Sequence, residues 1–209
     1  ELDKALSTST ITATTSMNQV YSELATYLIE KYGNGRNNTV DSSSNQTWIA
    51  IAGGPGTGKS TLAHELVKEI NQRVGGDDDI CVCLPMDGFH YSRKQLRHIA
   101  EDSTKQHGKG KHIRGGDDFP SSPVTFEDLL VRRGAPWTFN SKACAAMLTK
   151  AKTMKSGTLP FYSRTKSDPV YDLEDCTGSA VLLKPSHKIV IVEGNYFLYG
   201  NGKLRGHEK

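Results

Sequence analysis

The feature that most constrains the fold of this 209-residue chain is the segment GGPGTGKS at residues 53–60. It matches the pattern G-x-x-x-x-G-K-[ST] at every required position. The apolar run at 48–52 precedes it and is typical of a buried parallel strand. Apolar residues spaced by four follow it over about 60–74 and indicate a helix. A strand, a Gly-rich loop and a helix in this order predict a phosphate-binding loop, and hence a nucleotide site.

Each residue type in this loop has a chemical reason. Glycines let backbone N–H groups turn inward and approach a phosphate closely, and the following helix adds its positive end. Lys59 is placed to reach the β- and γ-phosphates, and Ser60 can ligate Mg²⁺. The predicted nucleotide-binding residues are Gly53, Gly54, Pro55, Gly56, Thr57, Gly58, Lys59, Ser60 and Thr61.

Two further predicted strands, 80–86 and 188–192, are each followed by an acid. Ligands of open parallel sheets bind beyond the carboxyl ends of the strands, so both acids are expected beside the loop. Asp87 can accept a proton from an attacking hydroxyl or hold Mg²⁺ through water, and the alternative is a turn Asp before Gly. Glu193 matches the acid that orients Mg²⁺ in nucleotide-binding proteins. His90 can belong to the same site, or it can be a purely structural histidine.

The rest of the chain divides by composition. Eight of the ten residues from 7 to 16 are Ser or Thr, so 1–16 is expected to be a disordered tail. A single P-loop domain is expected over 17–200, beginning with a helix that Gly33 ends and including another helix at 141–155. The charged, Gly-rich stretch 97–122 is interpreted as a solvated loop insertion. Residues 201–209 are predicted to be a polar tail.

Composition excludes several classes of function. No run approaches the roughly 18 apolar residues of a membrane helix. Lys plus Arg number 26 and Asp plus Glu 23, an excess too small to argue for nucleic acid as a partner. The four cysteines show no CxxC…CxxC spacing, so buried or inert thiols are expected. A cytoplasmic protein without membrane or nucleic-acid partners is the expectation.

Several motifs, taken in order, resemble the phosphoribulokinase/uridine kinase family. Besides the loop, they are Asp-Gly-Phe-His at 87–90, RRGAPWTFN at 132–140, LPFYSR at 159–164 with Asp-Pro-Val at 168–170, and Val-Glu-Gly-Asn-Tyr at 192–196. The family includes bacterial-type pantothenate kinases. The chain is most similar to its fungal and bacterial subgroup described as fructose-transport or uridine-kinase-like proteins.

The resemblance implies a P-loop NTPase fold, a three-layer α/β sandwich with a parallel sheet of five strands in the order 2-3-1-4-5. It implies transfer of the γ-phosphoryl group of ATP to a hydroxyl of a small molecule, for example a nucleoside, a sugar, pantothenate or glycerate. ATP and Mg²⁺ are the implied cofactors. Lys59 would stabilise the transferring charge, Asp87 would be the base, and Ser60 and Glu193 would place Mg²⁺.

The resemblance also implies an acceptor site. His90, Arg133, Tyr162 and Arg164 are the candidates, because guanidinium groups match carboxylate and phosphate and a tyrosine can stack or hydrogen-bond. Structural ion pairs for the arginines and a core position for Tyr162 remain equally open. A homodimer is also left open.

Two departures from the family pattern matter. Asn140 stands where the family has Asp, so a charge-dependent role there is in doubt. Only three of the five strands and no arginine-bearing lid are visible, so the chain is expected to be C-terminally truncated and a poor kinase. Two alternatives to a kinase therefore stay open, a P-loop ATPase or NTP hydrolase and a catalytically silent nucleotide-binding module. The guanine-reading Asn-Lys-x-Asp of GTPases is absent from the sequence.

Overall fold

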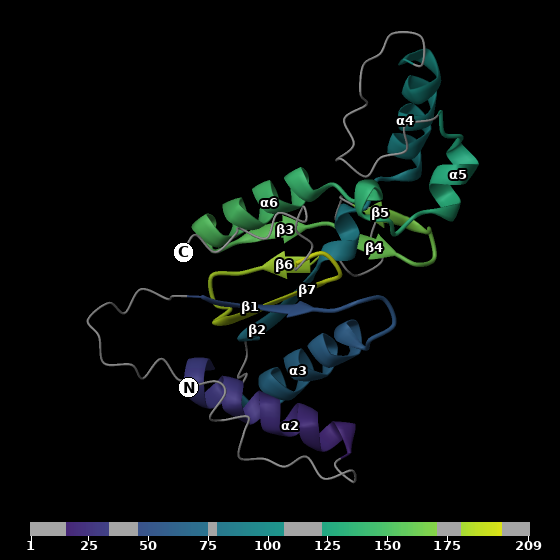
Figure 1. The fold of residues 1–209 in the computed structure, drawn as a ribbon. Helices are drawn as coiled ribbons and strands as arrows, with labels where there is room; N and C mark the ends of the chain where they lie inside the picture. The colour runs from purple at the N-terminus through teal and green to yellow at the C-terminus, as the bar shows by residue number, and fades with distance from the viewer. Residues whose placement is uncertain (1–15, 34–45, 75–78, 107–122, 171–180, 198–209) are drawn as a thin grey trace, which may run out of the picture.

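A parallel sheet of three strands lies at the centre of the fold (Figure 1). Strand β7 (Ile189–Gly194) is hydrogen-bonded to β1 (Thr47–Ala52) on one side and to β2 (Cys81–Pro85) on the other. All six residues of β7 are buried, as expected for a central parallel strand. The three predicted strands are confirmed, and the order β2-β7-β1 corresponds to 2-3-1 of the expected sheet.

The computed structural model describes residues 16–33, 46–74, 79–106, 123–170 and 181–197. The predicted tail at 201–209 and most of the tail at 1–16 lie outside these ranges. Ser16 is described, and its Oγ accepts a hydrogen bond from the backbone N–H of Gln19 at 3.3 Å. Ser16 is therefore the N-cap of the first helix, and including it in the tail was wrong.

Two helices cover one face of the sheet. They are α2 (Met17–Leu28), which a π-helical turn (Ile29–Gly33) extends, and α3 (Lys59–Val74), and both were predicted. Their apolar stripes pack on alternate residues of β7. The buried residues of this layer are Ala25, Leu28, Ala63, Leu66, Ile70, Cys81, Ile189 and Ile191.

The other face is covered by α6 (Ser141–Met154) and by a small antiparallel sheet of β3 (Gly157–Leu159) and β6 (Val181–Leu183). The helix starts at Asn140, whose Oδ1 accepts the backbone N–H of Ala143 at 3.1 Å. Asn and Asp are equally good N-caps, so the departure from the family pattern at this position costs the helix nothing. The result is the expected three-layer α/β sandwich (Figure 1).

The interpretation of 97–122 as a loop insertion was wrong in its first part. Residues 97–106 belong to α4 (Arg93–Gln106), which packs on α5 (Phe126–Val131) to form a small helical lobe. The lobe has its own core of Leu96, Ala100, Val124 and Leu129. The apolar stripe of α4 is narrow and lies among many charged residues, so the sequence pattern does not indicate a helix there. The remaining residues, 107–122, lie outside the described ranges.

A two-stranded hairpin, β4 (Phe161–Ser163) with β5 (Asp168–Val170), packs on the turn that follows β2. That turn is a 3₁₀ helix (Met86–Phe89), and a second 3₁₀ turn (Pro136–Thr138) lies beside it. The hairpin and the helical lobe are on the side of the sheet where β2 and β7 end (Figure 1).

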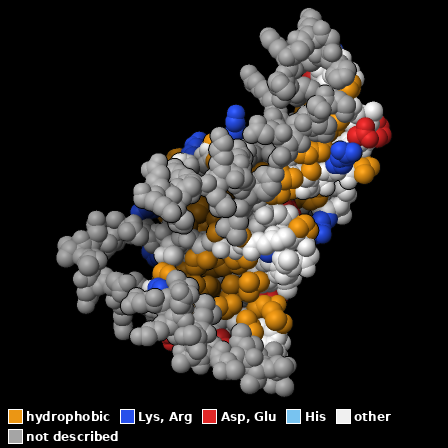
Figure 2. All heavy atoms as spheres, in the orientation of Figure 1, with side chains coloured by type: hydrophobic (Ala, Val, Ile, Leu, Met, Phe, Trp, Pro, Cys, Tyr) orange, Lys and Arg blue, Asp and Glu red, His pale blue; other side chains and the backbone are white. Residues whose placement is uncertain are grey.

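Among the described residues, β1 pairs with β7 alone, and a fourth and a fifth strand have no counterpart there. Figure 2 shows hydrophobic side chains gathered over the sheet on the visible face. Within the described ranges, no helix combines the length and the apolar character that a membrane crossing requires.

Three of the four cysteines are described, and all three are free thiols. Burial raises the pKa of Cys81 and of Cys83 to about 12 and that of Cys144 to about 11. Thiols with such pKa values carry almost no thiolate near neutral pH, as the prediction of inert cysteines requires. Cys176 lies outside the described residues.

The helical lobe gives a stability prediction. Leu96 is fully buried between α4 and α5, so Leu96→Ala should lower the free energy of unfolding by about 2–5 kcal/mol. Val131, at the end of α5, is 87% exposed, and Val131→Ala should change the free energy of unfolding by less than about 0.5 kcal/mol. Urea unfolding of both variants measures the difference. Equal stability of the two variants would show that residues 97–106 do not depend on this core.

Candidate active site

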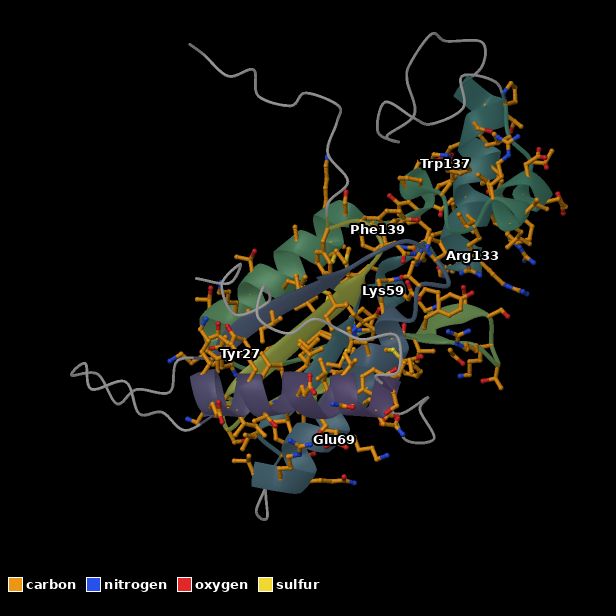
Figure 3. All side chains as sticks on the ribbon, turned by 60° about the horizontal axis from the view of Figure 1, so that its bottom comes forward. Tyr27, Lys59, Glu69, Arg133, Trp137 and Phe139 are labelled. Carbon is orange, nitrogen blue, oxygen red and sulfur yellow. The ribbon has the colours of Figure 1, made fainter. Side chains whose placement is uncertain are left out.

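The loop at 53–60 closes on itself through side-chain hydrogen bonds. Thr57 Oγ1 and Lys59 Nζ both donate to the carbonyl oxygen of Gly54, at 2.9 and 2.8 Å. Gly56 and Gly58 have φ values of +75° and +82°, which side chains rarely adopt. The loop leads directly into α3, which starts at Lys59, so the loop lies at the positive end of that helix. Figure 3 shows Lys59 near the end of the sheet.

The predicted metal-binding pair, Ser60 and Glu193, is brought together by α3 and β7. Ser60 Oγ donates to Glu193 Oε2 at 3.2 Å, and the Glu193 side chain is buried. Burial raises the pKa of Glu193 above its ordinary value, and the negative charge of Asp87 raises it further. The hydrogen bond from Ser60 and the positive charge of Lys59 partly offset this rise. Four predicted site residues therefore interact in one place.

Close packing surrounds the residue that follows each acid. Asp87 is followed by Gly88, where a Cβ would meet the carbonyl oxygen of Pro160 at 2.2 Å. Glu193 is followed by Gly194, where a Cβ would meet Met86 Sδ at 2.2 Å. Contacts that short do not occur, so neither glycine can be replaced without moving its neighbours. The end of β7 therefore packs closely on Met86, the residue after β2, and Gly88 packs closely on the start of the hairpin.

His90 lies in a cluster of aromatic rings beside Asp87. Its ring centroid is 5.5 Å from that of Phe139 and 6.4 Å from those of Tyr162 and Tyr196. Nδ1 lies 3.0 Å from the carbonyl oxygen of Asp87, and because a carbonyl only accepts, Nδ1 carries the proton. In the neutral ring Nε2 is then an acceptor, which suits a hydroxyl or N–H donor. His90 is 7% exposed, and its ring combines a structural bond through Nδ1 with a second nitrogen, Nε2.

The two candidate arginines differ sharply. Arg133 donates from Nη1 to the carbonyl of Ser167 at 2.5 Å, and from Nη2 to the carbonyl of Tyr91 at 2.9 Å and to Asp168 Oδ1 at 2.5 Å. Its Nε is buried and has no partner among the described residues. Arg133 therefore forms a structural ion pair with Asp168, which is one of the two roles that its sequence position allowed. Arg164, in the turn of the hairpin, is exposed.

Sequence reasoning missed two residues of this region. Asp168 accepts from Arg133 and from the backbone N–H of Arg93, and Tyr196 donates from its hydroxyl to the carbonyl of Gly134. Both lie within segments that carried the resemblance, Asp-Pro-Val and Val-Glu-Gly-Asn-Tyr. The signal was present in these segments, but nothing local indicated which partners the two side chains would find.

The oxygen atoms present fit Mg²⁺ better than a transition metal. Within the described ranges, no three His, Cys, Asp or Glu side chains are grouped so that they could hold a metal ion. Ser60 and Glu193 offer a hydroxyl and a carboxylate, and Asp87 offers a second carboxylate nearby. Mg²⁺ is usually held by one or two carboxylates, with water and substrate phosphates completing its shell, and this set agrees with that pattern.

Comparison with known proteins gives the class of the fold. No protein-family model matches the chain. A solved structure from Silicibacter sp., described as a "putative fructose transport system kinase", matches with a TM-score of 0.53 and 22% identity, over 84% of this chain and 63% of that one. A Saccharomyces cerevisiae structure, described as a "putative P-loop containing kinase with a circular permutation", matches with a TM-score of 0.55 and 16% identity, over 88% and 75%. The fold of this chain is therefore the P-loop α/β fold of these two structures.

A curated relative makes the assignment narrower. A Schizosaccharomyces pombe protein named "putative uridine kinase" is 33% identical over 152 residues, which are 72% of this chain and 51% of the relative. The resemblance to the phosphoribulokinase/uridine kinase family of P-loop kinases is therefore confirmed. The chain spans about half the length of this relative.

The buried acid gives a pH-dependent prediction. The raised pKa of Glu193 means that the folded protein binds its proton more tightly than the unfolded chain does. The contribution of Glu193 to stability therefore falls as the pH rises above its pKa in the unfolded chain, about 4.3, and stays low above its pKa in the folded protein. Glu193→Gln removes the charge, so relative to wild type the variant should gain stability as the pH rises above about 4, until Glu193 of the folded wild type is ionised. Glu127→Gln, an exposed acid, is the control. Urea unfolding across this pH range measures both, and a constant difference for Glu193→Gln would contradict the prediction.

Proposed function

We propose that the protein transfers the γ-phosphoryl group of Mg²⁺-ATP to a hydroxyl group of a small-molecule metabolite. The observation that carries this proposal is the convergence of Lys59, Ser60, Glu193 and Asp87 at one end of the parallel sheet. Phosphoryl transfer depends mainly on positioning and on charge stabilisation, and these residue types supply both. The homology to a protein named as a uridine kinase supports the same class of reaction.

Each residue then has a role. The N–H groups of the loop and Lys59 bind the phosphates, while Ser60 and Glu193 would hold a Mg²⁺ ion, which would neutralise phosphate charge. The acceptor oxygen attacks the γ-phosphorus, the bond to the bridging oxygen of ADP breaks, and the hydroxyl proton passes to the Asp87 carboxylate. A base in this position contributes roughly 10²–10⁴ in rate.

The acceptor is expected on the side of Asp87 that faces His90 and Tyr162. The two rings are 6.4 Å apart in an edge-to-face arrangement. Aromatic walls with one polar acceptor atom, His90 Nε2, suit a compact metabolite with more than one hydrogen-bond donor. Exposed Arg164 remains the candidate for contacting an anionic group of that metabolite.

The nucleotide site is tested at the loop. Lys59→Ala should weaken Mg²⁺-ATP binding at least roughly tenfold, because it removes the cation that faces the β- and γ-phosphates. Isothermal titration calorimetry measures the affinity, and Lys68→Ala, on the exposed face of α3, is the control. Unchanged affinity in Lys59→Ala would remove the basis for the nucleotide assignment.

The reaction is tested at the base. ADP release should depend on the addition of a hydroxyl compound in a screen of nucleosides, sugars, pantothenate and glycerate. With the compound that turns over, Asp87→Asn should leave ATP binding intact and lower kcat by roughly 10²–10⁴. Acceptor-independent ADP release would favour a hydrolase, and binding without turnover would favour a silent nucleotide-binding module. A kcat close to wild type would make Asp87 only a turn residue.

A further inference from the structure

Arg133, labelled in Figure 3, joins segments that are distant in the sequence through its hydrogen bonds. Its side chain is only 12% exposed. It donates to the carbonyl of Tyr91, which follows His90, and to the carbonyl of Ser167 and the carboxylate of Asp168 in the hairpin. One guanidinium group therefore connects the chain beside the candidate base to the hairpin that carries Tyr162.

Asp168 extends this connection to the helical lobe. The oxygen that accepts from Arg133 also accepts the backbone N–H of Arg93, the first residue of α4, at 2.9 Å. A carboxylate at the start of a helix is stabilised by the helix dipole. An anion that bound to Nη1 and Nη2 as the present partners do would have to displace this carboxylate and two carbonyl oxygens, and would leave them without their donor. Nε has no partner among the described residues, but it is buried.

The hairpin is thereby fixed on both sides of Tyr162. Before it in the chain, Pro160 and Phe161 lie against Gly88, where no Cβ fits. After it, Asp168 and Ser167 are held by Arg133, whose Cζ also lies 5.3 Å from the centroid of the Tyr162 ring. The ring is thus held at its observed place near His90.

We propose that Arg133 and Asp168 form a positioning pair that places Tyr162 relative to His90 and Asp87, and that Arg133 does not bind the charge of the acceptor. The pair fixes the geometry of the acceptor side and leaves the nucleotide side unaffected. The effect on acceptor affinity rests on the function proposed above, whereas the placement of the hairpin does not depend on it.

The first test needs no acceptor. Arg133→Gln and Asp168→Ala should each raise amide hydrogen exchange in residues 160–170 roughly tenfold. The double variant should show less than the sum of the two single effects, taken as free energies, because both changes remove the shared ion pair. Asp168→Asn should give a smaller increase in the same residues. Exchange in residues 53–60 and the affinity for Mg²⁺-ATP should stay at wild-type values, which also verifies folding. Lys94→Gln, an exposed residue of α4, is the control. Unchanged exchange in Asp168→Ala, or additive effects in the double variant, would contradict the proposal that the two residues act as a pair.

The second test separates positioning from direct binding of an anion. With the hydroxyl compound that turns over in the screen, Asp168→Ala should raise the acceptor KM as much as Arg133→Gln does, while the KM for ATP stays constant. If Arg133 instead gripped the acceptor, Asp168→Ala would free the guanidinium and leave the acceptor KM equal or lower, which would overturn the proposal. Failure of the screen would contradict the proposed function, while the exchange experiment would still decide whether the pair exists.

Discussion

The pairing of β7 on both of its edges is the constraint on which the candidate site depends. The register places Gly194 beside Ala52, the last residue before the loop, and Glu193 beside Pro85, two residues before Asp87. Parallel strands end at the same edge of a sheet, so three connections from distant parts of the sequence meet there. A shift of β7 by one residue would turn Glu193 to the opposite face and separate it from Ser60.

Close packing also restricts which residues can follow the two acids at the strand ends. Both acids are followed by glycines that touch neighbouring atoms where other residues would carry a Cβ. A buried carboxylate beside a second one is unfavourable for stability, because burial and the charge of Asp87 both raise the pKa of Glu193. Sites that tolerate such costs are typically functional sites, where stability is lower than it could be. This agreement of sterics and charge supports a chemical role for the strand ends.

Much of this arrangement was predictable because it depends on local patterns. The loop, its flanking strand and helix, and the two acids follow from residue spacing within short windows, and the structure brings them together. The ion pair of Arg133 and Asp168 spans 35 residues, and nothing near Arg133 in the sequence identifies its partner. For α4, a narrow apolar stripe was outweighed by charged neighbours, and only packing against Leu129 reveals it. For His90, the bond between Nδ1 and the Asp87 carbonyl agrees with the structural role, and the acceptor-binding role stays a prediction.

The closed form of the loop has a consequence for the thermodynamics of binding. Thr57 and Lys59 meet at one carbonyl oxygen, so the loop already has a defined shape held by its own side chains. Little conformational entropy is then lost when an anion binds, which favours affinity. The ammonium group must, however, exchange the Gly54 oxygen for a phosphate oxygen, so the net gain from its charge is the difference between two hydrogen bonds. A loop of this kind should discriminate between anions by enthalpy, with the more highly charged phosphate chain preferred over single small anions.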